Sequence, residues 1–132
     1  MTTTRATGEF DVKLTPQPAG ESQMLGRMAI DKQFRGDLEG RSTGEMLTAG
    51  TEVKDSAGYV AIEQVSGSLQ GRSGTFILQH TGTMNRGRPS LSISVVPDSG
   101  TGELKGLSGT MTIDLGGGKH AYTFDYTIAK TG

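Results

Sequence analysis

One seven-residue pattern occurs three times in this chain of 132 residues. It reads Gly-Asp-Leu-Glu-Gly-Arg-Ser over residues 36–42, Gly-Ser-Leu-Gln-Gly-Arg-Ser over 67–73, and Gly-Glu-Leu-Lys-Gly-Leu-Ser over 102–108. Each copy ends one run of alternating apolar and polar residues and begins the next run. Glycines at fixed offsets between such runs are typical of turns between β-strands. Their repetition predicts a coiled sheet that closes into a small barrel.

Alternation between apolar and polar residues continues through most of the chain. It is clearest over residues 10–14, 28–34, 59–65 and 122–128, and no segment has a convincing helical period. We therefore predict an all-β fold, a single antiparallel eight-stranded barrel formed by one domain, residues 1–132. Closure removes exposed sheet edges, and a barrel of this size is either filled by its own side chains or wide enough for one small ligand.

Composition narrows the classes of function. With 13 basic and 14 acidic residues the chain lacks the positive charge typical of proteins that bind nucleic acid or anionic membranes. The absence of cysteine excludes disulfides and cysteine metal sites, and the two histidines show no metal-ligand spacing. We predict no metal and no cofactor. Since no apolar run has the length of a signal peptide or a membrane span, we expect a cytoplasmic protein.

Three polar residues lie on otherwise apolar phases of the predicted strands: Lys32, Glu63 and His80. If these phases all face the lumen, the three side chains converge in an apolar pocket, where a buried carboxylate needs Lys32 or His80 as a partner. Without a partner, burial would raise the pKa of Glu63 and make it a general acid or base. A structural ion pair at a barrel mouth or a subunit interface explains Lys32 and Glu63 equally well.

The same inward phases supply apolar and aromatic side chains around this cluster. We predict that eight of them line a ligand site: Met28, Met46, Tyr59, Phe76, Leu78, Tyr122, Phe124 and Tyr126. Val60 and Ile62 lie on the opposite phase of the strand that carries Tyr59. Apolar residues on both phases need cover outside the lumen as well, which predicts a homo-oligomer.

Residues 99–109, Ser-Gly-Thr-Gly-Glu-Leu-Lys-Gly-Leu-Ser-Gly, resemble the Gly-Thr-Gly-x-Phe/Leu-x-Gly-x-x-Gly segment of allene oxide cyclase and dirigent barrels. The whole chain is more closely similar to a bacterial family of unknown function placed with those barrels, through residues 31–46, 59–84 and 95–113. This resemblance implies an eight-stranded barrel with an apolar lumen, but no activity. The distant relatives form oligomers and guide apolar intermediates by shape. Their functional residues have no unambiguous match here, so none is transferred.

Three hypotheses of function follow. The first is a barrel that binds a small apolar or mildly polar molecule in its lumen. The second is a cofactor-free isomerase or cyclase in which Glu63 or His80 moves a proton and Lys32 or a tyrosine stabilises negative charge. The third is a structural barrel with a packed lumen. A cavity in the lumen would separate the first two hypotheses from the third, and whether the chain is an enzyme stays open at this point.

Overall fold

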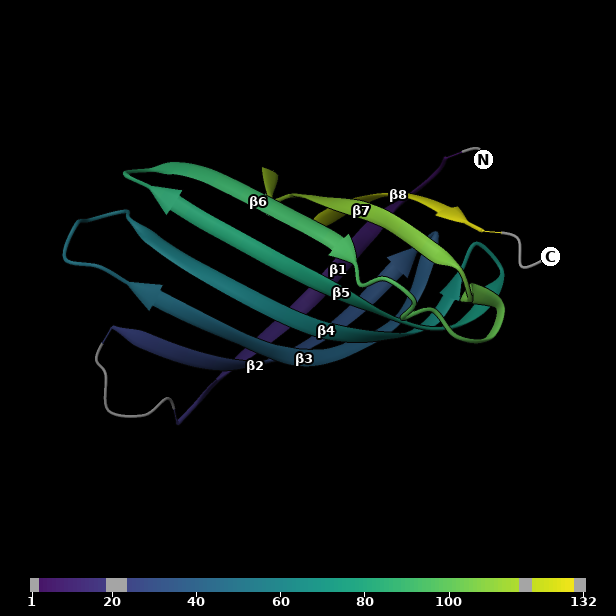
Figure 1. The fold of residues 1–132 in the computed structure, drawn as a ribbon, viewed down its shortest axis with the longest axis horizontal. Helices are drawn as coiled ribbons and strands as arrows, with labels where there is room; N and C mark the ends of the chain where they lie inside the picture. The colour runs from purple at the N-terminus through teal and green to yellow at the C-terminus, as the bar shows by residue number, and fades with distance from the viewer. Residues whose placement is uncertain (1–2, 19–23, 117–119, 130–132) are drawn as a thin grey trace.

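The protein is described here by a computed structural model that covers residues 3–18, 24–116 and 120–129. Its strands form a closed barrel in sequence order, each antiparallel to the next, and the last strand returns to the first (Figure 1). The strands are β1 (Thr4–Gln17), β2 (Leu25–Gly36), β3 (Leu38–Gly50), β4 (Ala57–Leu69), β5 (Arg72–Asn85), β6 (Arg88–Val95), β7 (Leu107–Asp114) and β8 (Ala121–Ile128). The all-β, eight-stranded antiparallel barrel predicted from the sequence is therefore confirmed.

Helical structure is minimal in the described part of the chain. A short 3₁₀-helix, η1 (Gly102–Leu104), precedes β7. No helix within the described ranges has the length and apolar character needed to cross a membrane.

The three copies of the glycine pattern lie at the same end of the barrel, at the right in Figure 1. They form the β2–β3, β4–β5 and β6–β7 connections, and alternate connections of an up-and-down barrel share one end. The third residue of each copy is a leucine, Leu38, Leu69 or Leu104, and all three are completely buried. Each copy therefore inserts one apolar side chain that helps to seal this end.

The copies do not all turn at the same position. In the second copy the chain turns at Gln70 and Gly71, whose φ angles of 47° and 89° match a two-residue hairpin turn. In the first copy the turn comes at Gly36, with φ 104°, and Gly40 lies inside β3. A methyl group on Gly40 would lie 2.4 Å from the carbonyl oxygen of Ser66. Gly40 thus allows β3 and β4 to approach closely rather than forming a corner.

Side chains fill the half of the lumen beside the sealed end. The rings of Phe76 and Phe124 stack there with centroids 5.8 Å apart. The Tyr122 hydroxyl accepts a hydrogen bond from the Leu38 amide at 2.9 Å and donates one to the Arg35 carbonyl, also at 2.9 Å. The buried apolar cluster comprises Ala6, Phe10, Phe34, Leu38, Val65, Leu69, Phe76, Leu78, Ile93, Val95, Leu104, Leu107, Met111, Tyr122, Phe124 and Tyr126. Burial of this apolar surface is the main source of stability.

At the opposite end, at the left in Figure 1, no pairing joins the described residues of β1 to those of β6 or β7. The β6–β7 ladder consists of the pairs made by Ile93 and Ser94, and the β1–β8 ladder covers residues 4–9 of β1. Beyond these ladders β1 and β6 continue as the two margins of a curved sheet. Pro16 lies on the free stretch of β1, where an edge strand tolerates its missing N–H. Over the residues that the structure describes, the barrel is therefore sealed at one end and open at the other.

Candidate functional site

The structure brings together the three polar residues that the sequence placed in the lumen. Glu63, on β4, is completely buried, and its Oε2 lies 2.9 Å from Lys32 Nζ on β2. The same oxygen lies 3.0 Å from His80 Nε2 on β5. Ser42, on β3, donates a hydrogen bond of 3.2 Å to Oε1. Four adjacent strands therefore supply one polar cluster, located where the packed half of the lumen ends.

The Glu63 carboxyl is held in its ionised form. Burial alone would raise its pKa, but the nearby His80 nitrogen and the ammonium of Lys32 stabilise the anion more strongly, so the pKa lies below its ordinary value. The Lys32 ammonium also lies 5.1 Å from the centroid of the Phe10 ring and 5.8 Å from that of Phe34, within the range of cation–π contacts. Lys32 and Glu63 thus form a buried ion pair between aromatic rings.

The lowered pKa of Glu63 predicts a loss of stability in acid. A carboxyl whose pKa is lower in the folded than in the unfolded chain stabilises the fold above the unfolded pKa, and this contribution is lost as the pH falls through the folded pKa. We expect the contribution of Glu63 to the free energy of unfolding to be complete above about pH 5 and to be lost below about pH 4. Urea titrations across this range measure the effect. In Glu63→Gln the part of the pH dependence that is due to the Glu63 carboxyl should vanish. An unchanged pH profile would contradict the lowered pKa of Glu63.

An inner cavity of about 240 Å³ lies on the open side of the cluster. Its wall is mostly apolar and includes Phe10, Ile30, Met46, Ala61, Leu91 and Ile113. The polar side chains in this wall are Lys32, Tyr59, His80 and His120. Glu63 and Ser42 do not belong to the wall and lie behind Lys32 and His80.

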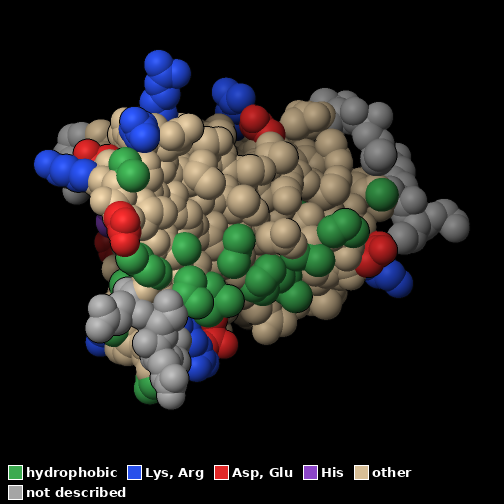
Figure 2. Space-filling model, turned by 60° about the vertical axis from the view of Figure 1, so that its left-hand side comes forward, with side chains coloured by type: hydrophobic (Ala, Val, Ile, Leu, Met, Phe, Trp, Pro, Cys, Tyr) green, Lys and Arg blue, Asp and Glu red, His purple; other side chains and the backbone are tan. Residues whose placement is uncertain are grey.

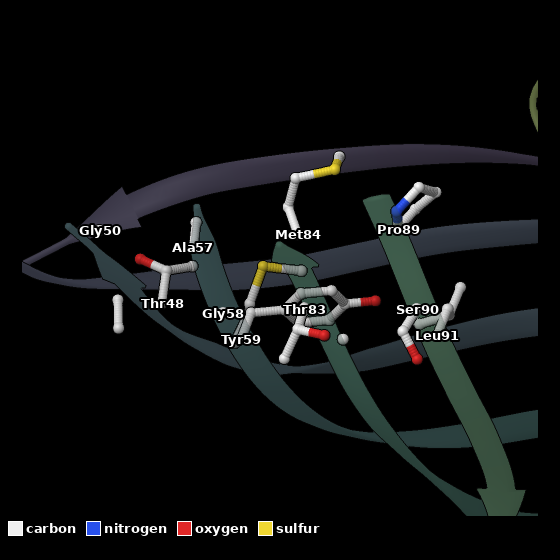
Figure 3. A pocket seen from close by; sticks show the side chains of 13 residues that line it. Thr48, Gly50, Ala57, Gly58, Tyr59, Thr83, Met84, Pro89, Ser90 and Leu91 are labelled. Atoms are coloured by element: carbon white, nitrogen blue, oxygen red, sulfur yellow. The ribbon is translucent and has the colours of Figure 1, made fainter. Parts of the chain in front are cut away.

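An outer cavity of about 610 Å³ continues from the inner one toward the solvent. The two cavities share Met46, Tyr59 and Leu91 as lining residues, and together we call them the lumen pocket. Figure 3 shows Met84 at the end of β5 and Leu91 on β6, with Tyr59 of β4 among the side chains around this outer cavity. A methyl group on Gly82 would lie 2.3 Å from the Tyr59 ring, so this glycine provides the space that the ring occupies.

The eight predicted ligand-site residues divide between the two halves of the barrel. Met46 and Tyr59 line the lumen pocket. The others are Phe76, Leu78, Tyr122, Phe124 and Tyr126, which belong to the packed cluster, and Met28, which is half-buried opposite Met46 and lines neither cavity. All eight share the inward phase. Their position along the barrel axis decides which of them line the pocket and which belong to the packed cluster.

Ser42, Leu91 and His120 belong to the site but were not among the residues predicted for it. The phases of Ser42 and Leu91 could have placed them in the lumen, since both alternate with outward-facing neighbours. His120 is different, because it lies before β8 in a connection, and nothing in the sequence indicates that such a residue covers a cavity. Its ring stacks on Phe10 with centroids 5.2 Å apart. Among the described residues no group of His, Cys, Asp and Glu side chains is arranged to hold a metal ion.

Apolar side chains also reach the outer surface, where Figure 2 shows hydrophobic groups gathered in a band across one face. Val60 and Ile62 point outward from β4 and are exposed, as is Leu47, which pairs with Val60 across the β3–β4 ladder. Adjacent exposed side chains of this kind favour association with another protein surface. The homo-oligomer expected from the sequence stays a prediction.

Comparison with known proteins agrees with this architecture. A crystal structure of a protein with unknown function from the DUF3224 family, from Shewanella oneidensis MR-1, matches with a TM-score of 0.95. The two chains are 54% identical, and the match covers 98% of this chain and 100% of the other. No curated protein matches. The model of the family described as "Protein of unknown function (DUF3224)" matches residues 6–126. The chain therefore belongs to the DUF3224 family.

Proposed function

We propose that this protein binds a small, largely apolar molecule in the lumen pocket. The observation that carries the proposal is an inner cavity of about 240 Å³ that opens into an outer cavity of about 610 Å³. Sites for small molecules are concave and mostly apolar, with a few placed polar groups, and have volumes of roughly 300–1,000 Å³. The lumen pocket combines these features, with the polar cluster at its floor.

The distribution of apolar side chains favours binding over a purely structural barrel. Protein interiors are normally close-packed, as the sealed half of this barrel is. In the open half, Leu91 faces the lumen pocket and is still 45% exposed, and Met84 and Leu115 are exposed as well. A ligand that covers such side chains gains about 25 cal/mol for each Å² of apolar surface removed from water.

One observation supports the second hypothesis, a cofactor-free isomerase or cyclase. His80 Nε2 is buried 3.0 Å from Glu63 Oε2 and has no other polar partner recorded among the described residues. An imidazole in the wall of the pocket could move a proton to or from a bound molecule. Glu63 lies behind His80 and would act through it as a positioning residue. Binding is common to both functions and is therefore the first step to test.

The proposal predicts saturable binding of naphthalene, a neutral apolar molecule that fits the volume of either cavity. We expect one molecule per chain in a calorimetric titration. Ala57→Trp adds an indole to the wall of the outer cavity and should weaken binding by about tenfold or more. Val60→Trp adds the same group to the outward face of β4 and should leave the affinity unchanged. Absence of saturable binding, or an equal loss in both variants, would contradict the proposal.

A further inference from the structure

The polar groups that a bound molecule would meet at the floor of the lumen pocket are nitrogens. Lys32 and His80 line the inner cavity, whereas the carboxylate of Glu63 lies behind them. The two other polar side chains in the inner wall, Tyr59 and His120, can also donate hydrogen bonds. Among the described residues no Asp or Glu lines either cavity. The acidic member of the cluster is therefore screened from the pocket by its basic partners.

The Lys32 ammonium has more hydrogen-bond donors than recorded acceptors. Glu63 accepts from Ser42 at one oxygen and from Lys32 at the other, which also contacts His80. A lysine ammonium has three N–H groups. Within the described ranges Lys32 Nζ has one recorded hydrogen-bond acceptor, and His80 Nε2 has none. Lys32 is only 7% exposed and His80 only 4%. Because His80 Nε2 lies 3.0 Å from Glu63 Oε2, the donors left over belong to Lys32. Buried donors normally have partners, so the Lys32 ammonium is suited to an acceptor supplied by a ligand.

The arrangement of charge favours a negative ligand over a positive one. A group that enters the inner cavity approaches the Lys32 ammonium before it approaches the Glu63 carboxylate. Coulomb attraction weakens with distance, so an anion there gains more from Lys32 than it loses to Glu63. A cationic group would meet the ammonium first and be repelled. Apolar walls, including Phe10 beside Nζ, strengthen both effects because they lower the local dielectric constant.

From this arrangement we infer that the ligand is an apolar molecule that carries a carboxylate or a comparable oxyanion. Its charged end contacts Lys32 and His80, and its apolar body lies along the lumen pocket against Met46 and Leu91. Glu63 is then a positioning residue that holds both nitrogens at the floor. The inference rests on the proposed binding function and adds the chemical class of the ligand to it.

Three compounds with one apolar body test the inference separately from the proposed function. Naphthoate, naphthalene and naphthylmethylamine are negative, neutral and positive at neutral pH. We expect naphthoate to bind about tenfold or more tightly than naphthylmethylamine, with naphthalene between them. If naphthylmethylamine binds as tightly as naphthoate, the inference is overturned while naphthalene binding still upholds the proposed function. If none of the three compounds binds, the proposed function itself fails.

Substitutions in the polar cluster test whether it causes the preference for naphthoate. Lys32→Met combined with Glu63→Gln removes both charges of the ion pair together and so leaves neither one buried alone. We expect this double variant to reduce the preference for naphthoate over naphthylmethylamine to about twofold or less. His80→Phe should reduce the preference in part, and it decides the matter if the double variant does not fold.

The control removes an ion pair from the outer surface. Asp31→Asn with Arg41→Gln eliminates the exposed pair between β2 and β3, whose side chains meet at 2.9 Å, and should leave the preference unchanged. Circular dichroism verifies the fold of each variant. If both cluster variants keep the full preference for naphthoate, or if the surface variant loses it equally, the inference is overturned.

Discussion

Replacing Glu63 by glutamine should lower the free energy of unfolding by about 3–5 kcal/mol. The substitution keeps the shape of the side chain but removes the charge that is paired with the Lys32 ammonium. Lys32 stays buried among Phe10, Phe34 and the pocket wall without a counter-ion. Removing one partner of a buried ion pair is costly because the other charge is then uncompensated in a medium of low dielectric constant. Urea unfolding followed by circular dichroism at neutral pH measures the change.

Glu45→Gln is the matched control for this experiment. Glu45 pairs with Arg27 on the outer surface, where both side chains are exposed to solvent. Exposed ion pairs contribute about 0–1 kcal/mol, so the control should change stability by no more than that. Adding Lys32→Met to Glu63→Gln should restore most of the lost stability, since neither charge is then stranded. A loss below about 1 kcal/mol in Glu63→Gln would contradict the buried pairing described here.

Leu69→Ala should lower the free energy of unfolding by about 2–5 kcal/mol, whereas Leu91→Ala should change it by less than about 1 kcal/mol. Both leucines point into the barrel. Leu69 is completely buried at the sealed end, and Leu91 is 45% exposed at the open end. Truncation at the sealed end removes apolar contacts and leaves a cavity in a close-packed region. The same truncation at the open end only widens a pocket that is already there.

Naphthalene affinity should show the reverse order in these two variants. Leu91→Ala removes part of the pocket wall and should weaken binding, and Leu69→Ala should leave the affinity of the folded protein unchanged. Urea unfolding and calorimetric titration of both variants measure the two effects. Equal losses of stability would mean that the open end is packed as tightly as the sealed end, which would contradict the division of the lumen into two halves.

The repeated glycine pattern illustrates how far local sequence predicts this fold. Its second copy forms a corner as expected, because the turn at Gln70 and Gly71 is a property of the local chain. In the first copy the corner lies at Gly36, and Gly40 is used inside a strand. Residues of β4 that are distant in the sequence require that glycine, because they leave no room for a side chain. The difference arises from strand pairing and has no local signal.

Side-chain alternation was sufficient to predict which residues face the lumen. Lys32, Glu63 and His80 meet because each occupies the inward phase of its strand, and the period of a strand is local. The pairing of Glu63 could also be anticipated, since a carboxylate in an apolar interior needs a partner. The sequence could not predict which of these groups reach the pocket, because that depends on which member of the cluster lies in front of the others.

The sequence by itself determined the all-β class, the closure into a barrel and the inward-facing set of residues, because strand period and turn chemistry are properties of short segments. The tertiary structure alone decided where along the barrel axis packing ends and the lumen pocket begins. That level depends on the register between strands and on how far β7 and β8 extend beside β6 and β1. Tyr59 and Tyr122 both point inward, yet only Tyr59 lines the pocket, because they lie on opposite sides of that level.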